Sequence, residues 1–422
     1  MKMNSRIISL IAATVLVMST FAANVKTDRT WYLAGEAMKV SITDDDALIA
    51  YAELCDTYSM AAGVVVSLER GEGTGIIELP SDIHSGYYVL SVYTRDNANV
   101  SQRLVAVVNP LHKSEDDDIQ WVAITHPDSL SYPQAGNHGD RLFDVNGFNQ
   151  KPVPVIPPMI PETEGHIIKA HVKNVYDGKT FRGSQIRPSI GVIGKQIHYF
   201  EGKMVNDSIA VFYTYGVHGK QPLVLSATSS TGVSLPIEMI SPFAVLLPKE
   251  LPHLVFHYQR SEVEARSMEM QRHQIVVGGG ENKATVTPLD YDETVFGTKP
   301  YLSYNLDEYR QFLTVREVLI EYVNCVSNRK VNGVPQLFVR REQDPYDSSW
   351  PTLVLIDGMP VNDVERLLNY DARRIHYINI YGGQYTFGKG IYNGILSFVS
   401  RSGLLTNYKT ESNVQYLEYQ FP

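Results

Sequence analysis

Short strand-like segments recur at close spacing in the first quarter of this chain, and this spacing restricts its fold more than any other feature. Gly, Asp and Asn residues separate the segments, which is typical of a chain that folds back and forth as strands. The stretch from Gly86 to Thr94 alternates in the manner of a strand with one dry and one solvated face. These strands predict a β-sandwich over residues 23–110. The expected strands are 37–42, 47–54, 63–68, 73–78, 86–93 and 103–108.

A similar pattern returns in residues 165–248 and predicts a second β-sandwich. The residues between the two, 111–164, contain an acidic run from Glu115 to Asp118 and a proline-rich stretch, so we expect an extended linker outside any core. The 26 tyrosines of the chain, together with many Val and Ile residues, also favour strands over helices. The strands expected in the second sandwich are 166–172, 208–215 and 221–226.

The last third of the chain mixes helix and strand signals. A connector over residues 249–299 leads to a predicted small α/β domain over 300–403, and residues 404–422 are expected to form a C-terminal tail. In the α/β domain we expect a buried strand at 353–356 followed by a turn, and further strands at 375–381 and 394–400.

Helix N-caps can be assigned at three places in this domain. Asn305 is followed three positions later by Glu308, which is the pattern of a capping box. Thr314 is a second expected cap, and either Asn362 or Asp363 is expected to cap the helix that runs through Leu368.

The N-terminus has the order of a secretory signal: a basic start, an uncharged apolar stretch from Ile7 to Ala23, and small residues at its end. A membrane-spanning helix is the alternative, but the stretch is shorter than the ~20 apolar residues that a span requires. We therefore expect residues 1–22 to be a signal peptide cleaved after Ala22, and the mature protein to be exported.

Charge and cysteine content exclude some functions. The chain has 37 Lys and Arg residues against 46 Asp and Glu residues, which argues against a general nucleic-acid binder. Its two cysteines, Cys55 and Cys325, could form a disulfide in an exported protein, but a core of this size does not need one. We expect two free buried thiols.

Two regions resemble known families. The informative N-terminal residues are Trp31 to Glu36, Ala50 to Leu54, Gly73 to Gly75 and Ser85 to Leu90. They resemble the macroglobulin-like domains of exported Bacteroidetes proteins. The informative residues within 300–403 are Pro351 to Val361, Asp371 to Tyr381, Tyr385 to Gly388, Gly394 to Phe398 and Gly403. They resemble the plug domain of TonB-dependent outer-membrane receptors. The resemblance implies a mainly β multidomain protein with two macroglobulin/Ig-like β-sandwiches and a small plug-like α/β domain.

The chain also departs from both families. Only residues 404–422 follow the plug-like region, and because the smallest membrane barrels have about eight strands of 9–11 residues, we expect no barrel from this chain. No TonB-contacting segment is recognisable, and neither cysteine belongs to a Cys-Gly-Glu-Gln thioester. The resemblance implies that Asp357 and Gly358 form a structural turn, in which Gly358 adopts positive φ and the Asp357 carboxylate caps the turn.

Glycines and histidines in the connector offer two possible sites. Gly278 to Gly280 follow an apolar segment, Ile275 to Val277, but lack the Lys and Ser or Thr of a phosphate loop, so we expect a strand and a flexible turn. His253 and His257 could hold zinc on a helix, with Glu262 and Glu264 nearby. Their segment looks like a strand, where positions four apart lie about 13 Å apart, and we expect no metal there.

The remaining polar clusters are expected to be solvated loops. His138, Asp140 and Asp144 lie in the predicted linker, and the runs Asp44 to Asp46 and Glu115 to Asp118 lack the alternating ligand pattern of a calcium loop. No Gly-x-Ser-x-Gly elbow positions a nucleophile. We therefore predict no catalytic, cofactor or metal site.

The functional prediction depends on an aromatic cluster in the plug-like region, Tyr381, Tyr385, Phe387 and Tyr392. In a receptor the barrel wall surrounds the plug, so without a barrel this cluster could bind an outer-membrane or periplasmic protein. The alternative is that the rings close the domain's own core. We predict a non-enzymatic periplasmic or outer-membrane-associated protein for binding or assembly, which reaches the membrane through a partner. The alternative is an exported hydrolase whose site is assembled from residues distant in sequence.

Overall fold

The structure is a computed structural model of the 422-residue chain. It describes residues 23–95, 100–122, 159–163, 165–193, 197–281, 294, 296–331, 333–340, 350–387, 390–401 and 413–422, with the side chains of 273–281 left out. The predicted signal peptide and the residues His138, Asp140 and Asp144 lie outside this part of the chain.

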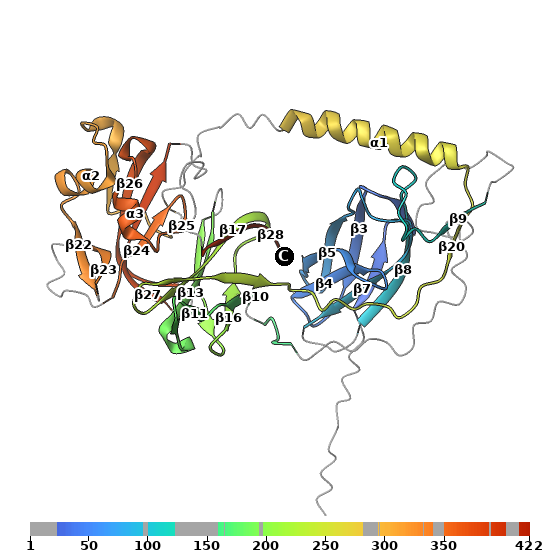
Figure 1. Ribbon diagram of the computed structural model, residues 1–422, viewed down its shortest axis with the longest axis horizontal. Coiled ribbons are helices and arrows are strands. Elements are labelled where there is room, and N and C mark those ends of the chain that lie inside the picture. Colours follow the sequence, from blue (N-terminus) through green and yellow to red (C-terminus); the bar gives the residue numbers. More distant parts are fainter. Residues whose placement is uncertain are drawn as a thin grey trace, which may run out of the picture.

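The chain is a mainly β multidomain protein with few helices, which confirms the predicted fold class (Figure 1). Two β-sandwiches lie side by side, and the α/β domain packs on the far side of the second one (Figure 1). Among the described residues, no helix is both long and apolar enough to cross a bilayer.

The first sandwich consists of a three-stranded and a five-stranded sheet. The smaller sheet has the order β1 (Asn24–Thr27), β3 (Ala37–Thr43), β6 (Glu72–Glu78). The larger has the order β2 (Trp31–Leu33), β8 (Val100–Val108), β7 (Gly86–Thr94), β4 (Ile49–Cys55), β5 (Met60–Ser67). In β3 the side chains of Met38, Val40 and Ile42 point into the core while their neighbours are exposed, which is the two-residue period of a strand with one solvated face.

The prediction that β7 has one solvated face is wrong, because all nine of its residues are buried. Its outer face is covered by segments distant in sequence. Near Tyr93 the cover is Phe243 to Leu246, and near Tyr87 it comes from residues around Phe256. A strand that other parts of the chain cover on both faces needs no polar side.

The second sandwich also has two sheets, and the end of the chain completes one of them. The first sheet has the order β15 (Lys203–Met204), β16 (Ile209–Thr214), β10 (His166–Val172), β19 (Ile237–Ile240). The second has the order β14 (His198–Glu201), β13 (Ile186–Val192), β17 (Gly219–Ser229), β18 (Ser234–Leu235). A hairpin, β11 (Val175–Tyr176) and β12 (Lys179–Thr180), and the 3-10 turn η2 (Gly183–Gln185) lie beside them.

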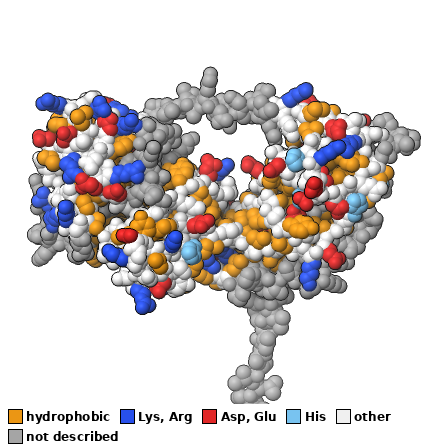
Figure 2. Space-filling model, in the orientation of Figure 1, with side chains coloured by type: hydrophobic (Ala, Val, Ile, Leu, Met, Phe, Trp, Pro, Cys, Tyr) orange, Lys and Arg blue, Asp and Glu red, His pale blue; other side chains and the backbone are white. Residues whose placement is uncertain are grey.

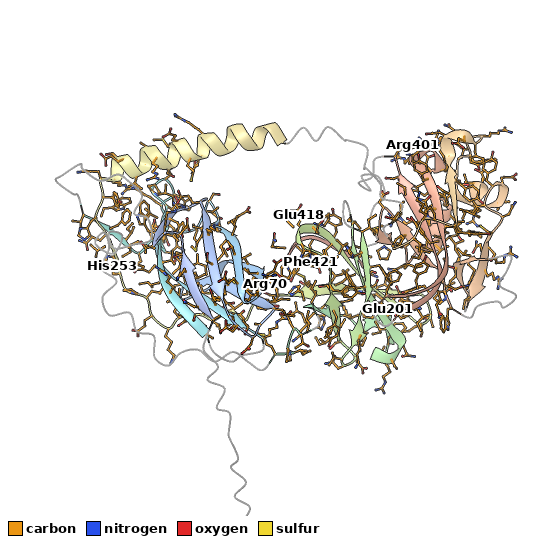
Figure 3. All side chains as sticks on the ribbon, turned by 180° about the vertical axis from the view of Figure 1, so that it is seen from behind. Arg70, Glu201, His253, Arg401, Glu418 and Phe421 are labelled. Carbon is orange, nitrogen blue, oxygen red and sulfur yellow. The ribbon has the colours of Figure 1, made fainter. Side chains whose placement is uncertain are left out.

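Residues expected to form a C-terminal tail instead belong to this sandwich. Strand β28 (Gln415–Phe421) pairs antiparallel with β17, and Tyr419 and Phe421 are buried in the core of the second sandwich. Figure 3 shows Phe421 at the end of the sandwich that faces the first one. The α/β domain is thus inserted between the earlier strands of this sandwich and its last strand.

The predicted linker and connector also contribute structure. Strand β9 (Ile119–Trp121), from the predicted linker, pairs in parallel with β20 (Leu254–Phe256), from the predicted connector. The ring of Phe256 lies 5.0 Å from the ring of Trp31, on β2 of the first sandwich. These two strands therefore extend the core of the first sandwich rather than running outside it.

Helix α1 (Arg260–Glu281) overturns the expected strand at Ile275 to Val277 and the expected turn at Gly278 to Gly280, because both lie within it. In the N-terminal half of the helix, Val263 and Met270 pack on the first sandwich. From there the helix extends toward the α/β domain (Figure 1).

The C-terminal domain has one mixed sheet with short helices against it. The sheet order is β21 (Leu302–Asn305), β26 (Ile375–Phe387), β27 (Gly390–Ser400), β24 (Leu353–Ile356), β25 (Met359–Pro360). The hairpin β22 (Val326–Val331) and β23 (Val334–Val339) packs beside it. The helical elements are η3 (Leu306–Glu308), α2 (Val315–Glu321), α3 (Val364–Leu368) and η4 (Ala372–Arg374).

Side-chain capping follows the sequence at all three predicted places, because Asn305 also accepts the Asp307 N–H, at 3.1 Å. Thr314 forms a capping box with Glu317, whose carboxylate accepts the Thr314 N–H at 3.0 Å. Asp363, not Asn362, caps α3 by accepting the Arg366 N–H at 3.0 Å. Asn305 begins only the three-residue turn η3 instead of the expected helix.

The turn after β24 forms as the family resemblance implies, but its carboxylate has another partner. Asp357 and Gly358 both have positive φ, 48° and 85°. A Cβ at Gly358 would lie 2.8 Å from the Ile197 side chain, so the position also requires a small residue. The Asp357 carboxylate accepts hydrogen bonds from the Ser400 N–H at 2.7 Å and from the Ser400 hydroxyl at 2.5 Å, and it therefore links the end of β24 to the neighbouring strand β27.

Candidate binding site between the second sandwich and the C-terminal domain

The predicted aromatic cluster lies on the β26–β27 hairpin, where it packs against the second sandwich. Tyr381 and Tyr392 are buried, while Tyr385 and Phe387 are half-buried. The Tyr199 ring, from β14, lies 5.7 Å from the rings of both Phe387 and Tyr392. The cluster therefore packs in the interface between the C-terminal domain and the second sandwich. Strand β14 of the same chain covers it, so it is neither an open surface nor part of one domain's core alone. Binding of an external partner by these residues stays a prediction.

The hairpin reaches the second sandwich because it is bent by a bulge. The β26–β27 register shifts between Tyr381 and Gln384, where Gly383 has a φ of 125°. Beyond the bend, Gly390 lies so close to Glu201 that a Cβ would be 2.2 Å from the carboxylate. Glycine at this position therefore lets Glu201 of β14 approach the hairpin.

A hydrogen-bonded group of four side chains joins the two domains at this point. Arg187 donates from Nε and Nη2 to the two carboxylate oxygens of Glu201, at 3.2 and 2.9 Å. The Tyr392 hydroxyl also donates to Glu201. The hydroxyl oxygens of Tyr392 and Tyr199 lie 2.8 Å apart. The Arg187 guanidinium carbon lies 5.6 Å from the centre of the Tyr392 ring.

Burial fixes the protonation of these groups. It raises the pKa of Tyr199 to about 12 and that of Tyr392 well above its usual value, with nearby Glu201 acting in the same direction. Burial by itself would lower the pKa of Arg187, but the hydrogen bonds to Glu201 outweigh it and raise that pKa. At neutral pH both tyrosines are therefore neutral donors and Arg187 is a cation paired with Glu201.

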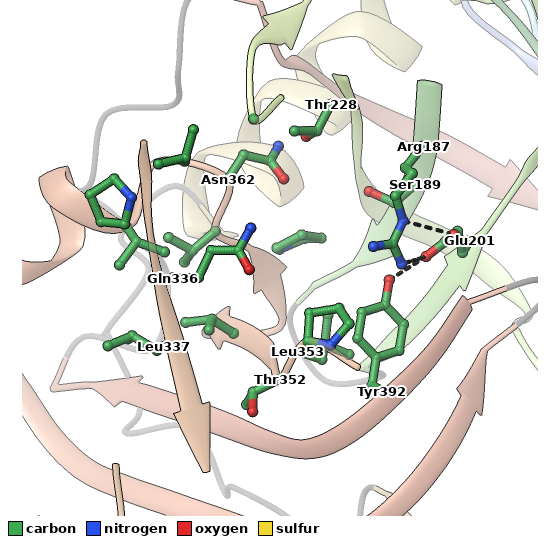
Figure 4. A pocket seen from close by; sticks show the side chains of 18 of the residues that line it. Arg187, Ser189, Glu201, Thr228, Gln336, Leu337, Thr352, Leu353, Asn362 and Tyr392 are labelled. Carbon is green, nitrogen blue, oxygen red and sulfur yellow. Dashed lines mark hydrogen bonds and ion pairs between the residues drawn. The ribbon is translucent and has the colours of Figure 1, made fainter. Parts of the chain in front are cut away.

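Beside this group is a cavity of about 190 Å³ (Figure 4). One wall comes from the second sandwich and is mostly polar; the other comes from the C-terminal domain and is mostly apolar. Arg187 and Ser230 are exposed, so the cavity opens to solvent on the side of the second sandwich. The polar wall includes Arg187, Ser189, Tyr199, Glu201, Thr228, Ser229 and Ser230, and the Tyr392 hydroxyl joins it from β27 of the C-terminal domain. The apolar wall includes Val334, Pro335, Leu337, Pro351, Leu353, Val354, Pro360, Val361 and Val364.

Several polar groups of the lining are already bonded within the protein. The hydroxyls of Ser189 and Ser226 lie 2.7 Å apart, and the Thr352 hydroxyl donates to the carbonyl of Asn393 at 2.8 Å. Asn362 differs, because its buried Nδ2 has no hydrogen-bond partner among the described residues. Figure 4 shows the amides of Asn362 and Gln336 extending toward the space opposite Arg187.

Except for Tyr392, which belongs to the predicted aromatic cluster, no sequence pattern indicates the residues of this group as a site. Arg187 and Glu201 are brought together by the pairing of β13 with β14, in which Ser189 is opposite Glu201. Gln336 and Asn362 come from the other domain, and the sequence predicts Asn362 only as a possible helix cap. The pairing of strands and the packing of domains thus assemble a site whose members share no motif.

A second buried polar group connects the two sandwiches. Glu162 accepts from Arg95 Nη1 at 2.8 Å and from the Tyr51 hydroxyl at 2.7 Å, and it lies 3.0 Å from Nδ1 of His166. The other ring nitrogen of His166 lies 2.6 Å from the Tyr419 hydroxyl on β28. Figure 2 shows apolar side chains gathered over the region where the sandwiches meet. The end of the chain is thereby connected to the first sandwich through His166 and Glu162.

The other sequence candidates have structural partners. Asp44 accepts the N–H groups of Asp46 and Ala47, as in a polar turn, and Asp117 accepts the N–H of Ser85 at 2.7 Å. In the connector, His253 contacts Asp118. Glu264 pairs with Arg260. In the described part of the chain, no three His, Cys, Asp or Glu side chains are grouped as metal ligands.

The prediction of free thiols is confirmed. Neither Cys55 nor Cys325 is in a disulfide. Cys55 is buried and Cys325 is half-buried, so only the burial of the first is complete. Burial raises the pKa of Cys55 to about 12, and the acidic neighbours Glu53 and Asp56 act in the same direction, so its thiol stays protonated at neutral pH.

Comparison with known proteins gives distant structural matches only. No protein-family model matches the sequence, and no curated protein matches it. Among solved structures, the BSP domain of a biofilm-associated protein matches at 10% identity, covering 54% of this chain and 30% of that one, with a TM-score of 0.17. A Salmonella alpha-2-macroglobulin mutant matches at 11% identity over 52% of this chain and 14% of that one, with a TM-score of 0.18.

A tandem of titin Ig domains also matches, at 10% identity over 56% of this chain and 97% of that one, with a TM-score of 0.16. This chain thus spans less than a third of the first two matched structures and nearly all of the third. With TM-scores this low, we base no functional inference on these matches.

Proposed function

We propose that this chain is a non-enzymatic, exported protein that binds another protein of the bacterial envelope, and that the cavity beside Arg187 and Glu201 is part of its binding surface. The observation that carries the proposal is the state of Glu201, the one carboxylate among the described residues that line the cavity. Both of its oxygens accept hydrogen bonds from Arg187, and the Tyr392 hydroxyl donates to it as well.

This saturation favours binding over hydrolysis. A hydrolase needs a carboxylate, histidine or thiolate that is free to accept a proton, or a nucleophile within reach of such a base. In this cavity the carboxylate is occupied, and the described lining contributes no His, Cys, Asp or Lys side chain. A lining of hydrogen-bonding and apolar groups without a free base is suited to holding a ligand unchanged.

The proposed location and type of partner rest on the sequence. The signal-like N-terminus supports export, and the plug-like pattern of residues 300–403 supports docking on an outer-membrane or periplasmic protein. The structure adds a physical reason for a scaffold role. Buried hydrogen bonds join the first sandwich to the second, from Arg95 to the Ile167 carbonyl, and the second to the C-terminal domain, between Tyr199 and Tyr392, so the three units would present their surfaces in a fixed arrangement.

The test is chemical crosslinking in the native envelope, followed by purification of the tagged mature chain and mass spectrometry. We expect one envelope protein to be enriched over a control with an unrelated exported β-sandwich protein. The purified chain should not hydrolyse a panel of peptide and glycan substrates. Turnover of any substrate that depends on Glu201, or crosslinks no different from the control, would contradict the proposal.

A further inference from the structure

We propose that the cavity between the second sandwich and the C-terminal domain binds one apolar residue of a partner polypeptide together with its flanking peptide groups. This inference rests on the proposed function, and it adds the chemical class of the ligand. It follows from the charge, the two walls and the size of the cavity.

The charge of the cavity favours a neutral ligand. Arg187 and Glu201 are its only charged lining residues in the described part of the chain, and they neutralise each other through two hydrogen bonds. The Glu201 side chain is only 9% exposed. A charged ligand would lose its hydration without gaining an unpaired opposite charge, and this makes its burial unfavourable.

The polar groups of the cavity match a peptide unit. Asn362 and Gln336 each carry an amide, which can donate to a carbonyl and accept from an N–H. The Nδ2 of Asn362 is buried and has no partner among the described residues, so a rotation of the side chain into the cavity would let it donate to a ligand carbonyl. The third guanidinium nitrogen of Arg187 points away from Glu201 and offers further donors on the opposite wall (Figure 4).

The apolar wall and the volume specify the rest of the ligand. Val334, Leu337, Leu353, Val354 and Val361 line the same C-terminal wall as the two amides, and this surface suits an aliphatic side chain. At about 190 Å³ the cavity is smaller than the roughly 300–1,000 Å³ of sites for drug-sized molecules. One residue with its two peptide groups is the scale of ligand that we expect.

Capped amino acids test this inference on the mature full-length chain. Ligand-observed NMR should detect N-acetyl-leucinamide with a dissociation constant on the order of 1 mM, because ligands this small bind weakly. N-acetyl-glutamic acid amide, N-acetyl-lysinamide and glucose should each bind at least about fivefold more weakly. The variants Asn362→Ala and Gln336→Ala should each weaken binding of N-acetyl-leucinamide about fivefold or more. Asn328→Ala changes an exposed amide of the same β22–β23 hairpin outside the cavity, and it should leave binding unchanged.

Several results would overturn the inference: no binding of N-acetyl-leucinamide, tighter binding of glucose or of a charged amide, or equal binding by the Asn362 and Gln336 variants. Capture of the envelope partner separates this failure from failure of the proposed function. If wild-type chain and the Asn362→Ala variant capture the partner equally well, the function stands and the ligand assignment is wrong. If neither captures a partner while N-acetyl-leucinamide binds, the ligand class stands and the proposed function is wrong.

Discussion

Arg95 provides the sharpest test of how the two sandwiches are joined. Its side chain is 4% exposed and the Glu162 side chain is 1% exposed. Arg95 donates to Glu162 at 2.8 Å and to the carbonyls of Ile167 and Pro242 at 3.0 and 3.2 Å. Arg95→Met keeps most of the apolar stem but leaves Glu162 as a buried carboxylate without its cation.

Loss of one member of a buried ion pair costs about 3–5 kcal/mol of unfolding free energy. With a urea m-value of roughly 2 kcal/mol/M, a loss of about 4 kcal/mol lowers the unfolding midpoint by about 2 M. Glu162→Gln removes the remaining charge, so the double variant Arg95→Met/Glu162→Gln should be less destabilised than the sum of the two single variants by more than about 1 kcal/mol.

The assay is urea unfolding followed by tyrosine fluorescence and by circular dichroism, because the three units need not unfold in one step. The matched control is Lys220→Met, which breaks the exposed Lys220–Glu418 pair, whose side chains are 63% and 64% exposed. The control should change stability by less than about 0.5 kcal/mol. A change for Arg95→Met that is no larger than the control, or additive effects in the double variant, would refute the view that this ion pair joins the sandwiches.

Three further predictions concern packing and titration. Phe387→Ser should destabilise the protein by about 2 kcal/mol, because the half-buried ring packs on Tyr199. The control Ile391→Ser, at a position 37% exposed, should change the thermal unfolding midpoint little. Equal effects of the two substitutions would mean that the Phe387 ring contributes no packing. Gly390→Ala should cost about 2 kcal/mol in urea unfolding, since its Cβ would lie 2.2 Å from the Glu201 carboxylate, and a wild-type midpoint would contradict this close approach. Burial raises the pKa of Tyr51, Tyr93 and Tyr419, so the native state holds protons that the unfolded state releases above pH of about 10, and stability should fall as the pH rises beyond that value. Urea midpoints measured between about pH 8 and 11 test this sign, and a midpoint that stays constant or rises over that range would contradict it.

The amino-acid sequence by itself determined the local structure where a few neighbouring residues suffice. The Thr314 capping box, the Asp363 cap and the turn at Asp357 and Gly358 all formed, because their hydrogen bonds or backbone angles depend on residues only a few positions away. The mainly β character was predictable for the same reason, since short segments with frequent turn residues favour strands.

Helix α1 shows where such local signals fail. Three consecutive glycines at Gly278 to Gly280 are each unfavourable in a helix by about 1 kcal/mol, and they indicated a turn. In its N-terminal half, Val263 and Met270 pack on the first sandwich. The apolar periodicity that normally reveals a helix is weak along this segment, so no helical pattern opposed the signal of the glycines.

Only the tertiary structure decided which distant segments meet. Strand β28 pairs with β17, although nearly the whole C-terminal domain lies between them in the sequence. Residues predicted as a tail are therefore part of the core, because β28 covers an otherwise open sheet edge. The cavity depends on the same kind of pairing: β13 and β14 bring Arg187 to Glu201, and domain packing brings Asn362 opposite them. A hydrogen bond between distant segments produces no recognisable motif, because it places no requirement on the residues next to either partner in the sequence. The strands were therefore predictable from the sequence, whereas the grouping of these side chains depends on the tertiary structure.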